Sequence, residues 1–191
     1  MAIHAGRHQF GTDRGRITLR TSRDGLAASA GHDLTIEIGY WSAELVVADD
    51  LSPSSLNVTA DLGSLVVVDG TGGLKPLTDR DKREIVISAR KVLSVDRFPQ
   101  VTFTAGAFKA EAEGGGGTID GTLTLAGKSG PLQLLVSPGG SGSYHAAGTI
   151  RQTDFGIKPY SGFLGALKVK DAVEVAVDVD LSSAADQESA A

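Results

Sequence analysis

The stretch from Leu93 to Gly127 decides the fold; it begins LSVDRFPQVTFTAGAF and ends GTLTLAG. Two runs in it alternate apolar residues with threonines, on either side of a loop that contains consecutive glycines. The apolar members are Val101, Phe103 and Ala105 in the first run and Leu123 and Leu125 in the second. A period of two places one face of a strand in an apolar interior and the other face in water. The stretch therefore predicts two strands of a sheet that is apolar on one side.

The same alternation recurs through most of the chain, in about nine candidate strands joined by short polar turns. The final strand is the clearest, because Val173, Val175, Val177 and Val179 alternate largely with acidic residues. Glycine, which favours turns, accounts for 25 of the 191 residues. Many short strands with closely spaced turns are typical of an antiparallel barrel or sandwich.

One segment, TDRDKREIVISARKVL beginning at Thr78, has its apolar residues at helical spacing instead. Thr78 and Asp81 have the spacing of a capping box, which begins a helix. Arg80 and Glu84 stand four residues apart, as ion pairs on one helix face do. We expect a helix near residues 79–92 that closes one end of a barrel, since its apolar face needs a partner. In that position the helix would control entry to the interior.

The length of the chain suits a single domain. We expect a flexible N-terminal segment over residues 1–14 and one β-barrel domain over residues 15–181. Residues 182–191 are small and polar, which predicts a disordered tail.

Charge and composition argue against several classes of protein. A net charge of −5 without a basic run disfavours nucleic-acid binding and an electrostatic membrane anchor. The absence of cysteine excludes disulfides, zinc-thiolate sites and thiol nucleophiles. The histidines are scattered, so we expect neither a metal nor a cofactor. The sequence leaves the oligomeric state open, and a homodimer is one option.

The location of the protein depends on whether Met1 is the native start. The first residues contain no apolar stretch typical of a secretory signal. A native Met1 therefore predicts a cytoplasmic protein, whereas a chain from which a leader had been removed would be periplasmic or secreted. No run approaches the roughly 18–20 apolar residues that an integral membrane segment needs.

Three motifs suggest chemistry, and each has a simpler interpretation. GTLTLAGKS, residues 121–129, resembles a phosphate-binding loop but has one residue too many between its glycines and alternates like a strand. His32 and Asp33 precede a strand with no nucleophile motif nearby, so we interpret His32 as a hydrogen-bonded strand-end residue. Arg151 and Asp154 suggest a structural ion pair. We find no set of catalytic residues.

Several pieces of the chain, in their order and spacing, resemble the YceI-like family. The central stretch is similar to the family's Phe-Asp-Val-x-x-Tyr-Pro step followed by a strand and a Gly-x-Leu-Thr-x-x-Gly strand. His32, the string TIRQTDFGI at residues 149–157 and the valine-rich last strand also match, so that the likeness runs from about Gly15 to Leu181. The resemblance implies an all-β fold, an eight-stranded antiparallel barrel of lipocalin-like shape with one inserted helix.

The resemblance also implies that the barrel holds a long apolar molecule, a polyisoprenoid or other fatty amphiphile. An eight-stranded barrel is wide enough for one slender ligand or for its own side chains. We therefore expect non-catalytic binding, sequestration or transport of such a ligand; the alternative is a filled barrel that serves as a structural or stress-response interaction domain. An enzyme acting on a lipid has the least support. The lumen candidates are Leu34, Ile36, Trp41, Val101, Phe103, Leu123, Leu125, Leu134, Ile150, Phe155, Val175 and Val177.

Overall fold

The computed structural model describes residues 4–111, 116–140 and 142–182. Antiparallel strands dominate it, with one α-helix among the described residues. The main sheet has eleven strands, in the order β1 (Gly6–Gly11), β5 (Trp41–Val47), β6 (Pro53–Asp61), β8 (Gln100–Ala110), β9 (Gly117–Leu125), β10 (Lys128–Gly140), β11 (Ser143–Arg151), β14 (Ala172–Asp180), β2 (Gly15–Thr21), β4 (His32–Ile38) and β7 (Leu65–Gly72). A small sheet is formed by β12 (Ser161–Gly162), β13 (Leu167–Val169) and β3 (Arg23–Asp24).

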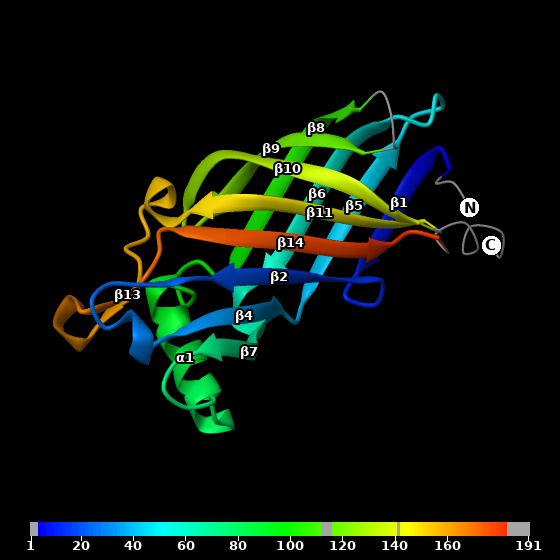
Figure 1. Cartoon of the computed structure of the whole chain (residues 1–191). Helices are drawn as coiled ribbons and strands as arrows, with labels where there is room; N and C mark the ends of the chain where they lie inside the picture. The colour runs from blue at the N-terminus through cyan, green and yellow to red at the C-terminus, as the bar shows by residue number, and fades with distance from the viewer. Residues whose placement is uncertain (1–3, 112–115, 141, 183–191) are drawn as a thin grey trace.

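The prediction of an antiparallel all-β fold with one inserted helix is confirmed, but the strand count differs from eight. Two long strands are bent, so that β4 continues into β5 and β6 continues into β7. If each bent pair is one strand and β1 is set aside, eight strands remain, and each pairs with a neighbour on both sides. The sheet curls into this ring in Figure 1. The count of eleven therefore arises because two strands of the expected barrel are each divided by a bend and because β1 is added at the edge.

Hydrogen bonds hold the two bends against each other. The amide of Gly39 donates to the carbonyl of Ser64 at 3.0 Å, and that of Tyr40 donates to Ser64 Oγ at 2.8 Å. The amide of Asp61 donates to the carbonyl of Tyr40 at 2.9 Å. Backbone amides that leave the strand ladder at the bends therefore donate to the neighbouring bend, which links the two bends to each other.

Residues 1–14 are predicted to be flexible, whereas β1 forms within this segment and pairs with β5. Phe10 on β1 meets Trp41 on β5 edge to face, with ring centroids 6.1 Å apart and planes at 83°. Such aromatic pairs add about 0.5–1.5 kcal/mol beyond the area they bury. This long-range contact explains the strand, which the polar local sequence does not indicate. The predicted tail lies, except for Ser182, outside the described residues.

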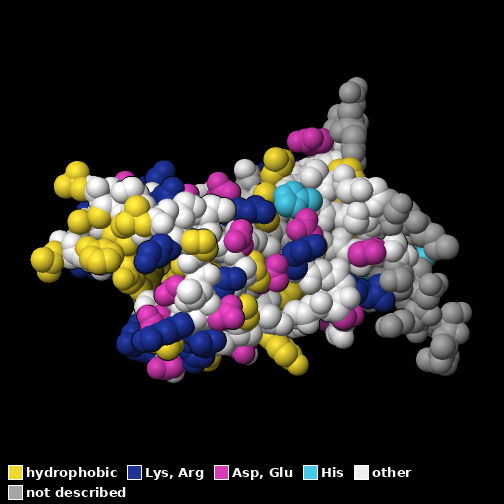
Figure 2. Space-filling view, turned by 60° about the horizontal axis from the view of Figure 1, so that its bottom comes forward, with side chains coloured by type: hydrophobic (Ala, Val, Ile, Leu, Met, Phe, Trp, Pro, Cys, Tyr) yellow, Lys and Arg dark blue, Asp and Glu magenta, His cyan; other side chains and the backbone are white. Residues whose placement is uncertain are grey.

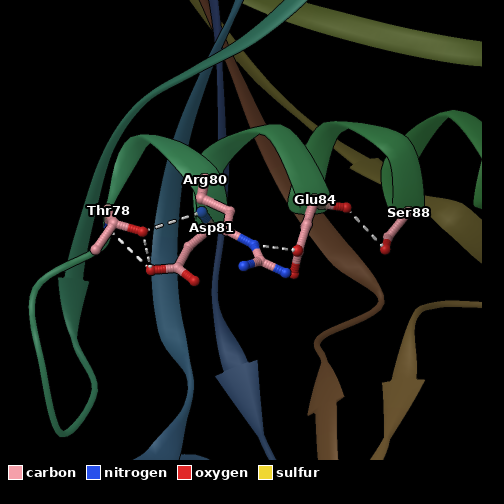
Figure 3. Close-up of polar contacts among 5 residues, drawn as sticks. All are labelled: Thr78, Arg80, Asp81, Glu84 and Ser88. Atoms are coloured by element: carbon pink, nitrogen blue, oxygen red, sulfur yellow. Dashed lines mark hydrogen bonds and ion pairs between the residues drawn. The ribbon is translucent and has the colours of Figure 1, made fainter.

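The helix α1 (Asp79–Val92) begins as predicted, with a complete capping box. The amide of Asp81 donates to Thr78 Oγ1 at 3.2 Å, while Asp81 Oδ2 accepts from the amide and hydroxyl of Thr78 at 2.8 and 2.7 Å (Figure 3). Arg80 Nε donates to Glu84 Oε1 at 3.0 Å, which confirms the expected ion pair. The helix packs against β7, and Lys82 Nζ donates to the carbonyl of Val68 at 2.9 Å.

Removing the cap should weaken the start of α1. Thr78→Ala deletes the hydroxyl that accepts from the amide of Asp81, and N-cap losses of this kind amount to about 1 kcal/mol. We expect that decrease in the free energy of unfolding by urea. Ser88→Ala, which removes a hydroxyl bonded only to the helix carbonyl of Glu84, is the control and should be neutral. Equal loss in both variants would contradict a role for the cap.

The capping box also predicts a pH dependence. Hydrogen bonds from the hydroxyl and the amide of Thr78 lower the pKa of Asp81 below its ordinary value of 3.8. A carboxyl whose pKa falls on folding stabilises the protein above the unfolded value and loses this effect as the pH falls through the folded value. We therefore expect Asp81→Asn to be less stable than the parent at pH 7. The difference between the two melting temperatures should shrink when the pH is taken well below 3.8.

Candidate ligand-binding cavity

A cavity of about 780 Å³ lies inside the ring of strands, next to α1. Its wall is made by inward side chains of the strands, by the apolar face of α1 and by the loops at one end. On α1 the contributing residues include Ile85, Ala89 and Val92. A volume of this size falls within the roughly 300–1,000 Å³ usual for small-molecule sites.

Most of the lumen candidates line this cavity. They are Leu34, Ile36, Val101, Phe103, Leu123, Leu125, Leu134, Ile150, Val175 and Val177. The period of two placed them on one face of their strands, and the ring turns that face inward. Their contact with a ligand stays a prediction.

The other two lumen candidates, Trp41 and Phe155, are buried but do not line this cavity. Along β4 the wall runs from His32 to Ile38; the chain then bends, and Trp41 packs on Phe10 beyond the cavity. Phe155 belongs to a short 3₁₀ turn rather than a strand, so that the strand period does not govern its direction. Its ring lies over Gly130, where an added Cβ would come within 3.3 Å of it.

Three segments surround the mouth of the cavity: residues 23–31, residues 71–77 and residues 160–168. Arg23 joins the first segment to the second. Its Nη1 donates to the carbonyl of Gly31 at 2.7 Å and to that of Thr71 at 3.4 Å. The third segment includes β12 and is bonded to the first, because the amide of Ala27 donates to the carbonyl of Ala166 at 2.8 Å. Hydrogen bonds therefore join all three segments of the mouth to one another. Its residues in the wall include Leu74, Tyr160 and Phe163.

Thr21 and Gln152 are two of the neutral polar residues in the wall, which also include Ser88, Thr102 and Tyr160. Thr21 Oγ1 is buried and has no hydrogen-bond partner among the described residues. Gln152 is 8% exposed, and its Nε2 donates to the carbonyl of Lys170 at 2.9 Å. A buried polar atom without a partner is costly, so a ligand group that bonded to Thr21 would be favoured. Sequence reasoning missed both residues, because each resembles an ordinary polar residue at a strand end.

The other sequence motifs have structural roles. His32 Nε2 lies 2.8 Å from the carbonyl of Lys75, which fits a hydrogen-bonded strand-end histidine. Residues 121–129 form the end of β9, a two-residue turn with φ of 51° and 75°, and the start of β10. Such a hairpin lacks the loop and helix of a phosphate site. Arg151 pairs with Asp171 at 3.5 Å, and not with Asp154 as the sequence suggested, because β11 runs beside the start of β14.

Within the described residues there is no group of three or more histidine or acidic side chains placed to hold a metal ion. None of the helices in that part of the chain has the length and apolar character to cross a membrane.

The ring of strands, its helix and its apolar cavity define a lipocalin-like barrel. The chain belongs to the YceI-like family, since the YceI-like domain matches residues 14–181. A UPF0312 protein of Yersinia enterocolitica is 34% identical over 89 residues, which are 42% of this chain and 45% of that protein. The chain thus spans less than half the length of this curated relative.

Two solved structures share the fold. BcnA of Burkholderia cenocepacia has a TM-score of 0.60 at 16% identity, with 88% of this chain and 96% of BcnA covered. A YceI protein of Campylobacter jejuni has a TM-score of 0.56 at 21% identity, with 75% and 81% covered. At these identities the likeness concerns the fold alone.

A charge introduced into the wall should distinguish an open cavity from a filled core. Leu125 is 7% exposed and faces the cavity, so the guanidinium of Leu125→Arg can extend into the open volume. Because water can enter the open volume and hydrate the charge, we expect a loss of only about 1–3 kcal/mol in the free energy of unfolding, the range measured for neutral polar groups. A charge without a partner in a filled core should cost roughly 3–5 kcal/mol by analogy with broken buried ion pairs.

Thr124→Arg is the matched control, because Thr124 points outward and its Oγ1 lies 2.8 Å from Ser129 Oγ. It should leave the stability of the domain nearly unchanged. Urea denaturation of both variants measures the difference, and unfolding of Leu125→Arg without denaturant would contradict an open lumen.

Proposed function

We propose that this protein binds a long apolar ligand, an isoprenoid or acyl chain, inside the barrel and sequesters or ferries it without catalysing a reaction. The observation that best supports this proposal is the cavity of about 780 Å³, in which the wall residues that come from strands are mainly leucine, isoleucine and valine. Such a wall recognises a ligand by its length and width. The filled-barrel alternative is less consistent with this volume.

The volume limits how much of a ligand is enclosed. A methylene group takes about as much room as a liquid water molecule, roughly 30 Å³, so the cavity holds on the order of 25 such groups. At about 0.8 kcal/mol for each buried methylene, the gross gain is about 20 kcal/mol before ordering costs. That already reaches the practical limit of non-covalent affinity at roughly 18–21 kcal/mol. A longer polyisoprenoid would extend through the mouth.

The positions of Thr21 and Gln152 support one orientation of the ligand. Both lie near the strand ends at the mouth, since Thr21 closes β2 and Gln152 follows β11. A ligand with one neutral polar end would place that end beside them and its chain deeper in the barrel. His32, also in the wall, already bonds a main-chain carbonyl, which favours a binding role over a catalytic one.

Filling part of the cavity should weaken uptake and leave folding intact. In Ala89→Trp the indole would occupy space inside the barrel, because Ala89 faces the cavity. If it displaces about three methylene groups of the ligand, at about 0.8 kcal/mol each, affinity should fall about 50-fold. Titration with a fluorescent long-chain lipid measures the affinity, and thermal melting checks the fold.

Ile87→Trp is the control, because Ile87 is on the same helix but 54% exposed to solvent. It should bind the lipid like the parent. Mass spectrometry of an organic extract of the purified protein would identify the ligand. Equal lipid affinity in both tryptophan variants and the parent would count against binding in the cavity and favour the interaction-domain alternative.

A further inference from the structure

Large apolar side chains stand in solvent at the mouth of the cavity. Leu26 is 100% exposed, Leu74 79% and Phe163 73%, and Leu164 is fully exposed as well. Figure 2 shows hydrophobic side chains gathered at the end of the molecule where β13 lies, with lysine or arginine beside them. We name Leu26, Leu74, Phe163 and Leu164 the apolar rim. Scattered exposed leucines are ordinary, whereas a group at a cavity mouth marks an interaction site.

The backbone holds part of the rim in a strained shape. Phe163 and Leu164 have φ of 49° and 54°, in the left-handed region that residues other than glycine rarely adopt. The amide of Ala166 donates to the carbonyl of Phe163 at 3.1 Å, and the Ala27–Ala166 bond fixes the neighbouring loop. Strain of this kind persists where the surrounding structure imposes it, often at functional sites. Here it keeps two large apolar side chains out of the core.

Basic residues accompany the rim, although the whole chain carries a net charge of −5. The segment 156–170 contains Lys158, Lys168 and Lys170 and no aspartate or glutamate. Lys75 follows Leu74 directly. Asp24 is the acidic residue beside Leu26, and the carboxylates of Asp81 and Glu84 come from α1 on the other side of the mouth. Asp171, which follows Lys170, pairs with Arg151 at 3.5 Å. The four lysines are exposed and outnumber Asp24, Asp81 and Glu84, in a chain whose net charge is −5.

We propose that the apolar rim docks on a bilayer surface that contains anionic phospholipids. The leucine and phenylalanine side chains enter the boundary between headgroups and acyl chains, and the lysines lie against the phosphates, which is how amphipathic surfaces bind membranes. Docked in this way, the mouth faces the acyl layer directly. Charge complementarity and continuity of the rim with the apolar wall favour a lipid surface over a second copy of the chain. The proposal needs no ligand in the cavity and goes beyond the binding function.

Co-sedimentation with vesicles tests the proposal. Vesicles of phosphatidylcholine alone and of phosphatidylcholine with phosphatidylglycerol at 7:3 are compared at low salt. We expect the parent protein to bind the anionic vesicles at least about tenfold more tightly than the neutral ones, and less tightly as salt rises. The double variant Leu26→Asp, Leu164→Asp should lose at least about tenfold in binding. Both side chains are exposed and neither lines the cavity, so the fold should be unchanged.

Leu51→Asp is the matched control. Leu51 is 54% exposed and also has a positive φ of 65°, but it lies in the hairpin between β5 and β6 at the opposite end of the molecule. It should sediment with vesicles like the parent. If the parent does not bind anionic vesicles, or if the double variant binds as well as the parent, the proposal is wrong.

Two further measurements distinguish membrane docking from self-association of the chain and from ligand binding in the cavity. A parent dimer that the double variant converts to a monomer, without vesicle binding, would overturn the proposal in favour of a self-association face. Uptake of the fluorescent lipid from a cyclodextrin complex, without vesicles, tests the cavity alone. Normal uptake together with absent vesicle binding overturns the docking proposal and leaves the binding function standing.

Discussion

The hydrogen-bonded corner between Gly39–Tyr40 and Ser64 is the constraint on which the barrel depends. At this corner two long strands bend together, so that each can pair with one set of neighbours before the bend and another set after it. The two bent strands stay paired with each other on both sides of the corner, and the ring closes because β4 also pairs with β2 while β6 also pairs with β8. Beyond the corner, β7 pairs with β4 alone among the described strands, and α1 packs against β7. The helix is thus a consequence of the bend as much as of its own sequence.

The cavity follows from a mismatch between the width of the ring and the size of its side chains. Eight strands enclose a space that large side chains can fill. Here the strand-derived part of the wall is mainly leucine, isoleucine and valine, with Phe103 as its one aromatic residue among those described. The aromatic residues Phe10 and Trp41 pack together beyond the cavity instead. The protein therefore has a solid core at one end and an open cavity at the other.

Local patterns predicted most of the strands and the helix, because alternation and the Thr78–Asp81 cap depend on residues close in sequence. They did not predict β1, whose stability comes from pairing with β5 and from the contact of Phe10 with Trp41. Within the site, strand residues such as Phe103 and Val175 were found by period. Thr21, Gln152 and the rim were not, because turns and loops have no period and their placement depends on contacts between distant segments. Whether the interior is open depends on the summed volume of all inward side chains, which no local pattern records.

The mouth of the cavity lies at one end of the molecule. The start of β1 and the end of β14 lie at the opposite end. Gly6 begins β1 and Asp180 ends β14, both away from α1 and β13 (Figure 1). A linker joined beyond either residue would hold the barrel by its solid end. Protein tethered in this way to a bead or a sensor chip would present its mouth to the surrounding liquid, so that it could be loaded, washed and reloaded without being released from its support.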